Sequence, residues 1–375
     1  MFLRKAFKYR LRPTKKQARR LRAMLDECRW LYNQMLEYRK LAYEELDVSL
    51  TKYDELMLLP GIKLERSSLL NEVHSQVLQD VIIRLDKAFE GFFRRVKAGE
   101  KPGYPRFRGI HRYDSFTYPQ SGFSLEGQNI LKLSKIGHIK IKLHRPIEGE
   151  IKTCTLICDV NGNWCVSLSC EVSAKPLKKT TKAVGIDVGI KNFAVLSDGT
   201  EIENPRFFKQ DEKALAKAQR KLSTLKKGTR ERRKQGKVVA KVHTRIRCRR
   251  ENFSHQLSRK IVNEYQYICA EDLNIKKMVE NSHLAKSIAD ASWSQFLRFL
   301  SYKAEEAGRK LGLVNPAYTT QTCNRCGHCA EKKLSERQHT CVQCGYSVDR
   351  DYNASQNILA LGLDGLGVIP RSLRL

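Results

Sequence analysis

The chain has 375 residues, of which 41% are hydrophobic, so it is long enough for two or three domains with buried cores. Its 70 lysines and arginines outnumber its 40 aspartates and glutamates, and a net charge of +30 repels itself unless a polyanion such as nucleic acid neutralises it. No run approaches 18 apolar residues, which excludes a membrane-spanning helix and leaves ribosome-associated and membrane-surface proteins as the alternatives for so basic a chain.

The cysteines and the N-terminal residues indicate a cytoplasmic protein. Four of the twelve cysteines form two Cys-x-x-Cys pairs, a pattern typical of zinc in a reducing compartment and not of a disulfide framework. The other eight are scattered, several of them in apolar runs where a thiol packs as a small hydrophobic group. The opening stretch "MFLRKAFKYRLRP" lacks the apolar core of a signal peptide.

The first elements along the chain are predicted to be a strand and a long helix. Residues 1–12 have the texture of a strand that Pro13 ends, and Thr14 is placed to cap the helix that follows. Apolar side chains then recur at helical spacing, namely Leu21, Met24, Leu25, Cys28, Leu31, Met35 and Leu36. Basic residues fill the other face, so we expect a helix with one buried and one solvated face.

A second long helix is predicted from about residue 70 to residue 96. Its apolar stripe consists of Val77, Val81, Leu85, Phe89, Phe92 and Phe93. The loop of residues 97–109 follows, because glycines and prolines there break regular structure. This loop interleaves arginines and lysines with aromatic rings, which suits phosphate pairing and base stacking, and equally a solvated turn with its rings turned inward.

Residues 129–173 are predicted to form strands. Residues 131–143 alternate apolar and polar side chains for most of their length, and Asn161-Gly162 is a strong signal for a hairpin between two further strands. We expect these strands and the N-terminal strand to form a small β-barrel that the two helices interrupt.

A lysine-rich linker near residues 175–182 leads into a second domain. Its first strand ends on Asp187, and an antiparallel meander follows with a turn at Asp198-Gly199. A long basic helical region comes next, in which residues 221–250 contain 13 lysines and arginines and a single acid. We expect residues 228–237 to form a loop within it, and we interpret the charge as a nucleic-acid groove rather than only a solvated face.

The rest of the second domain is predicted to contain two more strands. One spans the stretch at residues 265–273 and ends on acids that include Glu271, and the other covers residues 311–316 beyond a helix at about 292–308. The order is three antiparallel strands, helix, strand, helix, strand, which is the RNase H-type order. The predicted fold class is therefore α+β with several domains.

The two Cys-x-x-Cys pairs predict a zinc site. The candidate ligands are Cys323, Cys326, Cys341 and Cys344, with 14 residues between the pairs and a glycine after each pair. Four thiolates suit tetrahedral zinc, and the glycines let the backbone approach the sulfurs, whereas His328, Cys329 and His339 stand outside this spacing. So small and hydrophilic a segment needs its metal, because one structural zinc supplies about 10–16 kcal/mol of apparent binding energy to folding.

Three acids from separate elements form a second candidate site. Asp187 and Glu271 each end a strand, and Asp351 opens a helix beyond the second cysteine pair. A buried carboxylate needs a counter-ion, and three that converge on an RNase H-type sheet would hold two Mg²⁺ or Mn²⁺ ions for phosphodiester hydrolysis. Taken singly, Asp187 also fits a turn and Asp351 also fits a helix N-cap.

Ordered motifs are spread along nearly the whole chain: "YRLRPTKKQ", "CRWLYNQML", "LDKAFEGFFRRVKAGEKPGYPRFRG", "YDSFTYP", "GIDVGIKNFAVLSDG", "RRENFSHQLSRKIV", "AEDLNIKKM", "YTTQTCNRCG" and "CGYSVDRDYNASQNIL". In these motifs and in its length the chain resembles the TnpB family of transposon-encoded RNA-guided DNA nucleases, relatives of the type V CRISPR effectors. Two departures from the family pattern, "TTQTC" for Thr-Ser-Gln and "NAS" for Asn-Ala-Ala, touch no metal ligand, so we expect activity to survive.

The resemblance implies a domain organisation. It places a split wedge-type β-barrel at residues 1–13 and 118–178, a helical recognition domain at 14–117, a RuvC-like nuclease domain at 179–319 and 347–375, and an inserted zinc ribbon at 320–346. It also implies a guide RNA from the transposon end and cleavage of double-stranded DNA beside a short flanking motif. We expect a monomer or weak dimer in the prokaryotic cytoplasm, associated with the nucleoid.

The resemblance also assigns roles to single residues. Carried over by motif, the catalytic acids are Asp187 in "GIDVG", Glu271 in "AEDL" and Asp351 in "DRDYNAS". On a helix Asp349 and Asp351 would point about 200° apart, so only one can face the metals. Asp349 is then a cap or a turn residue.

Candidate nucleic-acid contacts lie in two parts of the chain, the N-terminal third and the basic helical region. For reading the flanking motif they are Arg29, Tyr32, Asn33, Tyr104 and Arg106, and in the basic helical region they are Lys226, Lys227, Arg245 and Arg249. The alternatives to a nuclease are an RNA-guided protein that binds DNA without cutting, which typically lacks one of the acids, and a transposase or transposase accessory protein that acts directly on DNA.

Overall fold

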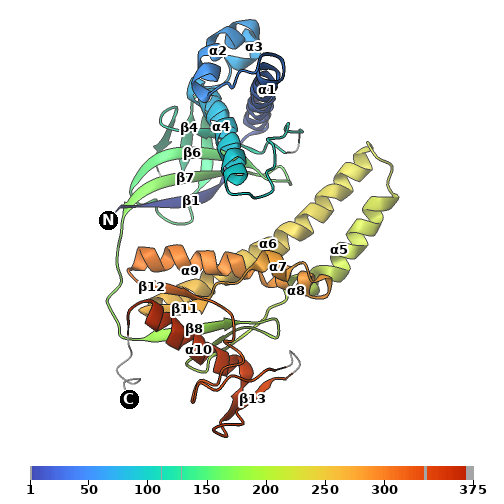
Figure 1. Ribbon diagram of the computed structural model, residues 1–375. Helices are drawn as coiled ribbons and strands as arrows, with labels where there is room; N and C mark the ends of the chain where they lie inside the picture. Colours follow the sequence, from blue (N-terminus) through green and yellow to red (C-terminus); the bar gives the residue numbers. More distant parts are fainter. Residues whose placement is uncertain (1, 111, 128, 333–335, 369–375) are drawn as a thin grey trace. The chain divides into compact units, whose positions relative to one another are not determined.

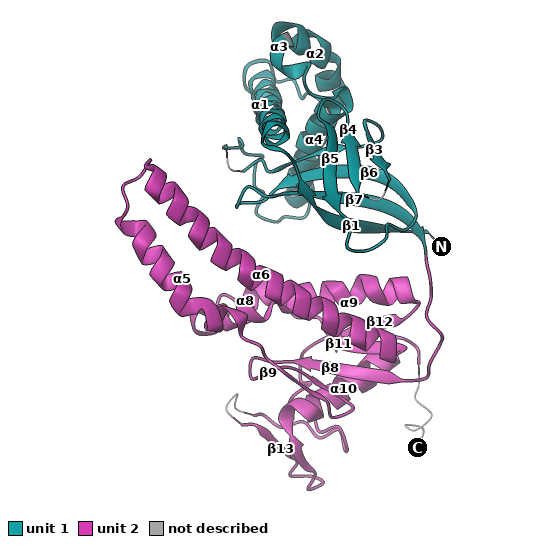
Figure 2. Cartoon of the chain, turned by 180° about the vertical axis from the view of Figure 1, so that it is seen from behind, with its two compact units in different colours: residues 1–173 teal, residues 174–375 magenta. Residues whose placement is uncertain are grey.

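The computed structural model describes residues 2–110, 112–127, 129–332 and 336–368. Residues 1–173 and residues 174–375 form two compact units, shown in separate colours in Figure 2, and each has a hydrophobic core of its own. No helix in the described ranges is both long and apolar enough to cross a bilayer.

The first unit contains a seven-stranded antiparallel sheet with the order β2-β6-β7-β1-β5-β4-β3. Its strands are β1 (Phe2–Arg12), β2 (Ser115–Tyr118), β3 (Phe123–Glu126), β4 (Ile130–Leu133), β5 (Gly137–Lys142), β6 (Glu150–Cys158) and β7 (Trp164–Ser173). The sheet curls in Figure 1, and its edge strands β2 and β3 are not paired with each other among the described residues. The predicted barrel is therefore present in a nearly closed form.

Strand β1 lies inside this sheet, between β7 and β5. It buries Phe7, Tyr9 and Leu11, which alternate with exposed basic residues as a strand with one buried face requires. The predicted hairpin joins β6 to β7, and Gly162 in its turn has a φ of +83°, which glycine adopts without strain. Strand β2 also belongs to this sheet. After the helices the sheet therefore begins again at Ser115, three residues before the boundary that the family resemblance implied.

Four helices belong to the first unit: α1 (Lys15–Leu46), α2 (Lys52–Glu65), α3 (Ser67–Leu70) and α4 (Ser75–Lys97). Thr14 caps α1 as predicted, since its hydroxyl accepts from the Gln17 backbone N–H while the Gln17 side chain accepts from the Thr14 N–H. All seven apolar positions predicted for this helix are buried, and α1 packs against α4.

The predicted start of the second long helix was wrong, and two helices that precede it, α2 and α3, were not predicted. Helix α4 begins at Ser75 and not near residue 70, because a separate short helix, α3, ends at Leu70. Phe93 of the predicted stripe is 51% exposed. Helix α2 escaped prediction because Pro60 lies inside it and exposed apolar residues such as Met57 blur its pattern.

The second unit is built on a five-stranded sheet with the order β10-β9-β8-β11-β12. Its strands are β8 (Ala183–Val188), β9 (Asn192–Leu196), β10 (Glu201–Glu203), β11 (Tyr267–Glu271) and β12 (Lys310–Val314). Strands β8 to β10 form the predicted antiparallel meander, and β11 lies parallel to β8 on one side and to β12 on the other.

Helices cover both faces of this sheet (Figure 1). The helices of this unit are α5 (Phe207–Thr224), α6 (Arg230–Glu264), α7 (Ile275–Met278), α8 (Ser282–Ala291), α9 (Trp293–Ala307) and α10 (Arg350–Gly365). Along β11, Ile268 and Ala270 join the core under α6 and α9, whereas Cys269 joins the core under α10. This alternation explains why β11 is apolar at nearly every position.

The basic helical region forms the two helices α5 and α6, which pack against each other as a hairpin. The loop predicted at residues 228–237 was wrong in extent, because α6 begins at Arg230 and the connection covers only residues 225–229. Thr229 caps α6 through its hydroxyl, which accepts from the backbone N–H of Arg232, and Gly236 is tolerated inside the helix. Helices α7 and α8 were not predicted.

Candidate active site

Asp187 and Glu271 lie at the carboxyl ends of two neighbouring parallel strands. The register pairs Ile186 of β8 with Ala270 of β11, so the two acids follow next to each other. Each is only 8% exposed. The carboxyl ends of parallel strands are where open sheets of this kind place their ligands.

Helix α10 packs closely against the sheet because glycines lie at the contact and let the helix and the strands approach each other. A Cβ atom added to Gly185 of β8 would lie 2.1 Å from the carbonyl oxygen of Ser355, and one added to Gly362 would lie 2.4 Å from Sγ of Cys269. Neither position accepts a side chain. The first turn of α10, which carries Asp351, is thereby held near the two strand ends.

The carboxyl group of Asp187 lies within reach of the charges of the other two acids. The pKa of Asp187 is raised well above its usual range, first by burial and then by the charges of Glu271 and Asp351, while Arg350 opposes the shift. Burial also raises the pKa of Glu271, against a hydrogen bond from Thr319. The Asp187 carboxylate accepts no hydrogen bond and forms no ion pair within the described residues. A buried, unpartnered carboxylate between two other acids fits a hard divalent cation such as Mg²⁺.

Asp349 and Asp351 have different surroundings. Asp349 is the N-cap of α10, and its carboxylate accepts from the backbone N–H groups of Asp351 at 2.8 Å and Tyr352 at 3.2 Å. Asp351 lies within the helix, where the guanidinium of Arg350 is 3.1 Å and that of Arg337 is 3.7 Å from its carboxylate. Asp349 is thus the cap, and its Oδ1 is committed to the helix start.

This difference predicts opposite outcomes for two alanine substitutions. Asp351→Ala should abolish DNA cleavage with little change in unfolding temperature, because it would remove one of the three candidate metal-binding acids and leave the helix intact. Asp349→Ala should keep most cleavage and lose about 1 kcal/mol of stability, which is typical of a lost N-cap. Cleavage assays and thermal unfolding separate the two. Asp349→Asn, which still caps, should restore the stability, and equal loss of cleavage in both alanine variants would contradict the assignment.

The structure brings the four paired cysteines together. The sulfurs of Cys323, Cys326, Cys341 and Cys344 all lie within 4.8 Å of one another. In each pair the carbonyl oxygen of the first cysteine accepts from the backbone N–H of the glycine that follows the second cysteine, Gly327 or Gly345. Both glycines have a positive φ. The backbone N–H of Cys344 lowers the pKa of Cys341 to about 6, although burial acts in the opposite direction. The cluster fits a zinc ribbon.

His328, Cys329 and His339, which lie near the paired cysteines in the sequence, do not belong to the four-sulfur cluster. Cys329 is exposed, and His339 is buried with its ring against Lys332. The short strands β13 (Gln338–Thr340) and β14 (Ser347–Asp349) pair in this segment, and β14 runs directly into α10. The cysteine ribbon, residues 320–346, is therefore tied to the helix that carries Asp351.

Three residues that connect the ribbon to the acids escaped the sequence analysis. Asn353 and Asn357 of α10 both donate to the carbonyl oxygen of Thr322, each at 2.7 Å. Thr319 donates to Glu271. The spacing of Asn353 and Asn357 is the signal that could have identified them. Residues at i and i+4 lie on one face of a helix and can contact the same neighbour.

Most of the nucleic-acid-binding candidates in the first unit are buried or bonded to other residues of the chain. Tyr32 is only 3% exposed, and the side chain of Asn33 both donates to and accepts from the backbone of Arg108, which fixes the 97–109 loop to α1. Arg29 lies 3.7 Å from Asp26. Tyr104 packs its ring edge-on against Phe89 and Phe92 yet stays 45% exposed, and Arg106 is exposed. Of these candidates, Tyr104 and Arg106 are therefore the most accessible to nucleic acid.

The nucleic-acid-binding candidates in the α5/α6 hairpin also divide into exposed residues and residues that pair within the protein. Lys226 and Lys227 are exposed in the connection between the helices. Arg245 and Arg249 instead pair with the buried carboxylate of Asp211, at 2.8 and 3.3 Å, and so help to join α6 to α5. Both arginines stay partly exposed, at 49% and 43%, and can still present charge to a phosphate.

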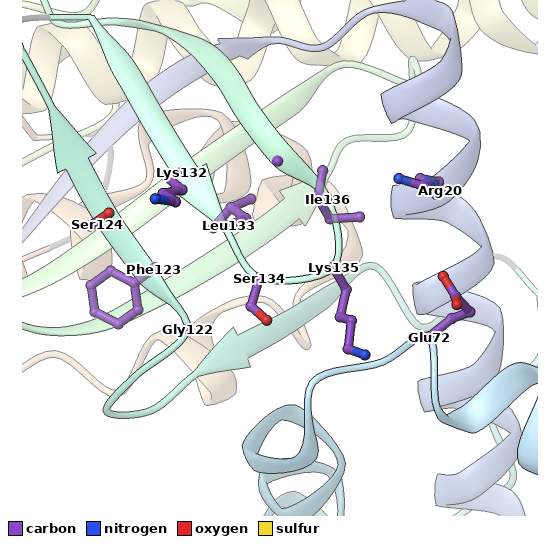
Figure 3. Close-up of a pocket in the computed structure, with 11 residues that line it drawn as sticks. Arg20, Glu72, Gly122, Phe123, Ser124, Lys132, Leu133, Ser134, Lys135 and Ile136 are labelled. Atoms are coloured by element: carbon purple, nitrogen blue, oxygen red, sulfur yellow. The ribbon is translucent and has the colours of Figure 1, made fainter.

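A pocket of about 740 Å³ lies in the first unit. Figure 3 shows Arg20 and Glu72 on its helical side and Phe123, Lys132 and Lys135 on the side of β3 and β4. It offers cations and an aromatic ring but no group of acids.

Comparisons with known proteins match the chain along nearly its whole length. A family model described as "Probable transposase" matches residues 166–282, one described as "Cas12f1-like, TNB domain" matches 293–358, and one described as "Helix-turn-helix domain" matches 1–46, which fold here as β1 and α1. A "CRISPR-associated endodeoxyribonuclease Cas12f1" of Sulfoacidibacillus thermotolerans is 25% identical over 60% of this chain and 57% of its own length.

Two relatives extend this similarity to the complete fold. A "Putative RNA-guided DNA endonuclease" of Streptomyces pristinaespiralis is 36% identical over 96% of this chain and 90% of its own length. The "Putative RNA-guided DNA endonuclease InsQ" of Escherichia coli is 31% identical over 95% of this chain and 92% of its own length. The chain therefore belongs to the TnpB family of transposon-encoded proteins.

Proposed function

We propose that this TnpB-family protein is an RNA-guided DNA endonuclease of a transposon. The names of the relatives that align over nearly the whole chain support this activity. The net charge of +30 and the exposed lysines of the α5/α6 hairpin support two polyanionic partners, a guide RNA from the transposon end and a double-stranded DNA target. Pairing with the guide would select the target, and a short flanking motif would be read by the protein, acting as a monomer or weak dimer.

In this proposal the units have separate tasks. The sheet and helices of the first unit act as the wedge and recognition domains, and the second unit acts as a RuvC-like nuclease domain into which the cysteine ribbon is inserted. The ribbon would hold one structural zinc ion through its four thiolates. No position is left open on such a site, so its contribution is to folding and not to catalysis.

The observation that carries the nuclease proposal is the buried carboxylate of Asp187, which is unpartnered among the described residues and lies near two other acids. Asp187, Glu271 and Asp351 would hold two Mg²⁺ or Mn²⁺ ions, which when bound supply an activated water and stabilise the leaving oxygen of a phosphodiester. The strand ends hold Asp187 and Glu271 in fixed positions. Arg350 offsets part of the negative charge until cations bind.

Copurification followed by cleavage tests the proposal. The chain is expressed together with its flanking genomic DNA, the bound RNA is sequenced, and a matching DNA target is incubated with the complex and Mg²⁺. We expect one RNA species that ends in the transposon and cleavage only of targets that match it. Absence of bound RNA would contradict every RNA-guided function. Bound RNA with target binding but no cutting would instead favour an RNA-guided DNA-binding protein.

A further inference from the structure

The hydroxyl group of Thr319 contacts one of the proposed catalytic acids. Its Oγ1 lies 2.6 Å from Oε1 of Glu271 and 3.1 Å from the carbonyl oxygen of Pro316, and the residue is only 2% exposed. A hydroxyl has a single proton to donate, and the shorter contact to a carboxylate is the stronger one. The proton of Thr319 therefore points at Glu271.

This contact restrains a group that has no other polar partner in the described parts of the chain. Glu271 is buried at the end of β11, and only Oε1 of its carboxylate accepts a hydrogen bond. A glutamate carboxylate has a broad range of terminal torsions when nothing holds it. With Oε1 fixed by Thr319, Oε2 is left free of hydrogen bonds among the described residues and is available to a ligand.

Helix α10 in turn fixes the segment that carries Thr319. The side-chain amide of Asn357 donates to the carbonyl oxygens of Thr319 at 2.9 Å and Thr322 at 2.7 Å. One turn earlier, Asn353 donates to Thr322 and accepts from the backbone N–H of Asn324, which lies between Cys323 and Cys326. The same helix carries Asp351 in its first turn. The entry of the cysteine ribbon is thus hydrogen-bonded both to Glu271 and to the helix that carries Asp351.

We propose that Thr319 is a positioning residue of the nuclease site, which orients the Glu271 carboxylate for divalent metal and joins that carboxylate to the ribbon and to α10. The inference rests on the proposed nuclease function. Outer partners that orient a metal ligand typically contribute 10- to 100-fold in metal affinity or activity. A role in folding alone would affect stability without changing the affinity for metal.

Three substitutions isolate the hydroxyl group. Thr319→Val keeps the shape and removes the hydroxyl, Thr319→Ser keeps the hydroxyl, and Thr320→Val is the matched control, since the Thr320 hydroxyl forms no hydrogen bond within the described residues. If Thr319→Val does not fold, Thr319→Ala compared with Thr319→Ser differs by the same oxygen atom. All variants are studied as complexes with the copurified guide RNA.

Two measurements are made on each complex. The first is the binding of Mn²⁺ followed by electron paramagnetic resonance of the free ion, with the Asp187→Ala complex as the background for ions held by RNA. The second is the rate of target cleavage as a function of Mg²⁺ concentration. We expect Thr319→Val to bind Mn²⁺ and to cut about 10- to 100-fold less well, with unchanged zinc content, while Thr319→Ser and Thr320→Val stay within about threefold of the parent.

The outcomes distinguish this inference from the proposed function. If Asp187→Ala lowers Mn²⁺ binding but Thr319→Val matches the parent, the positioning role of Thr319 is wrong and the nuclease site stands. Equal losses in Thr319→Val and Thr319→Ser would also overturn it, because the hydroxyl would then be irrelevant. If Asp187→Ala neither binds less Mn²⁺ nor cuts more slowly, the metal site itself is wrong and this inference fails with it.

Discussion

Asp187→Ala is expected to lower the rate of target cleavage by about a thousandfold or more while leaving the guide RNA bound. The substitution removes one of the two buried acids, and the loss of several kcal/mol of charge stabilisation corresponds to this factor in rate. The basic residues of the α5/α6 hairpin, which we expect to contact RNA, are untouched. The measurements are cleavage of a matching target with Mg²⁺ and sequencing of the RNA that copurifies.

The same substitution should not weaken the fold. In the absence of metal, Asp187 is destabilised by burial and by the charges of Glu271 and Asp351, so alanine should keep or raise the unfolding temperature measured in a chelator. Asp272→Ala is the matched control, because this exposed acid directly follows Glu271 and lies outside the buried site. Full cleavage by Asp187→Ala would refute the site assignment, and loss of bound RNA would show that Asp187 has a structural role instead.

Cys341→Ser is expected to reduce the zinc content of the purified protein to near zero. A serine hydroxyl does not replace a thiolate in a site of four sulfurs, and three remaining ligands do not close the tetrahedron. Because the ribbon has little apolar core, its two short strands should lose their pairing when the metal is lost. Zinc is measured by elemental analysis, and ordering of the ribbon by protection from a protease.

Cys329→Ser serves as the control for this experiment. Cys329 lies in the same ribbon but is exposed and outside the four-sulfur cluster, so its substitution should keep zinc at the parent level. Cleavage should fall in Cys341→Ser as well, because the ribbon entry holds the segment that contacts Glu271. Full zinc occupancy in Cys341→Ser, or loss of zinc in Cys329→Ser, would contradict the assignment of the four ligands.

Elements with a strong period were predicted well, and short or exposed ones were not. The stripe of α1 and the hairpin of β6 and β7 depend on neighbours within a few residues, which the sequence displays directly. Helices α3 and α7 have four residues each, too few to show a helical period. The loop predicted inside the basic region followed Gly228 and Gly236, but only Gly228 has a positive φ, and Gly236 lies within α6.

The sequence by itself determined which residues of this protein can form its two candidate metal sites. The cysteines recur at a spacing that lets one short turn present two sulfurs, and each strand acid follows an apolar run that must be buried. The cysteine spacing is a local property, so no knowledge of the fold was needed to select the four cysteines. Asp187 and Glu271 were selected from the predicted order of strands and from the family resemblance.

Only the tertiary structure decided how the candidates are used. Asn33 is engaged by a loop 75 residues away, Arg245 and Arg249 pair with Asp211 on another helix, and Thr319 contacts Glu271 across 48 residues of chain. Such partners are brought together by the packing of separate elements, which depends on the complementarity of whole surfaces and leaves no periodic trace in the sequence.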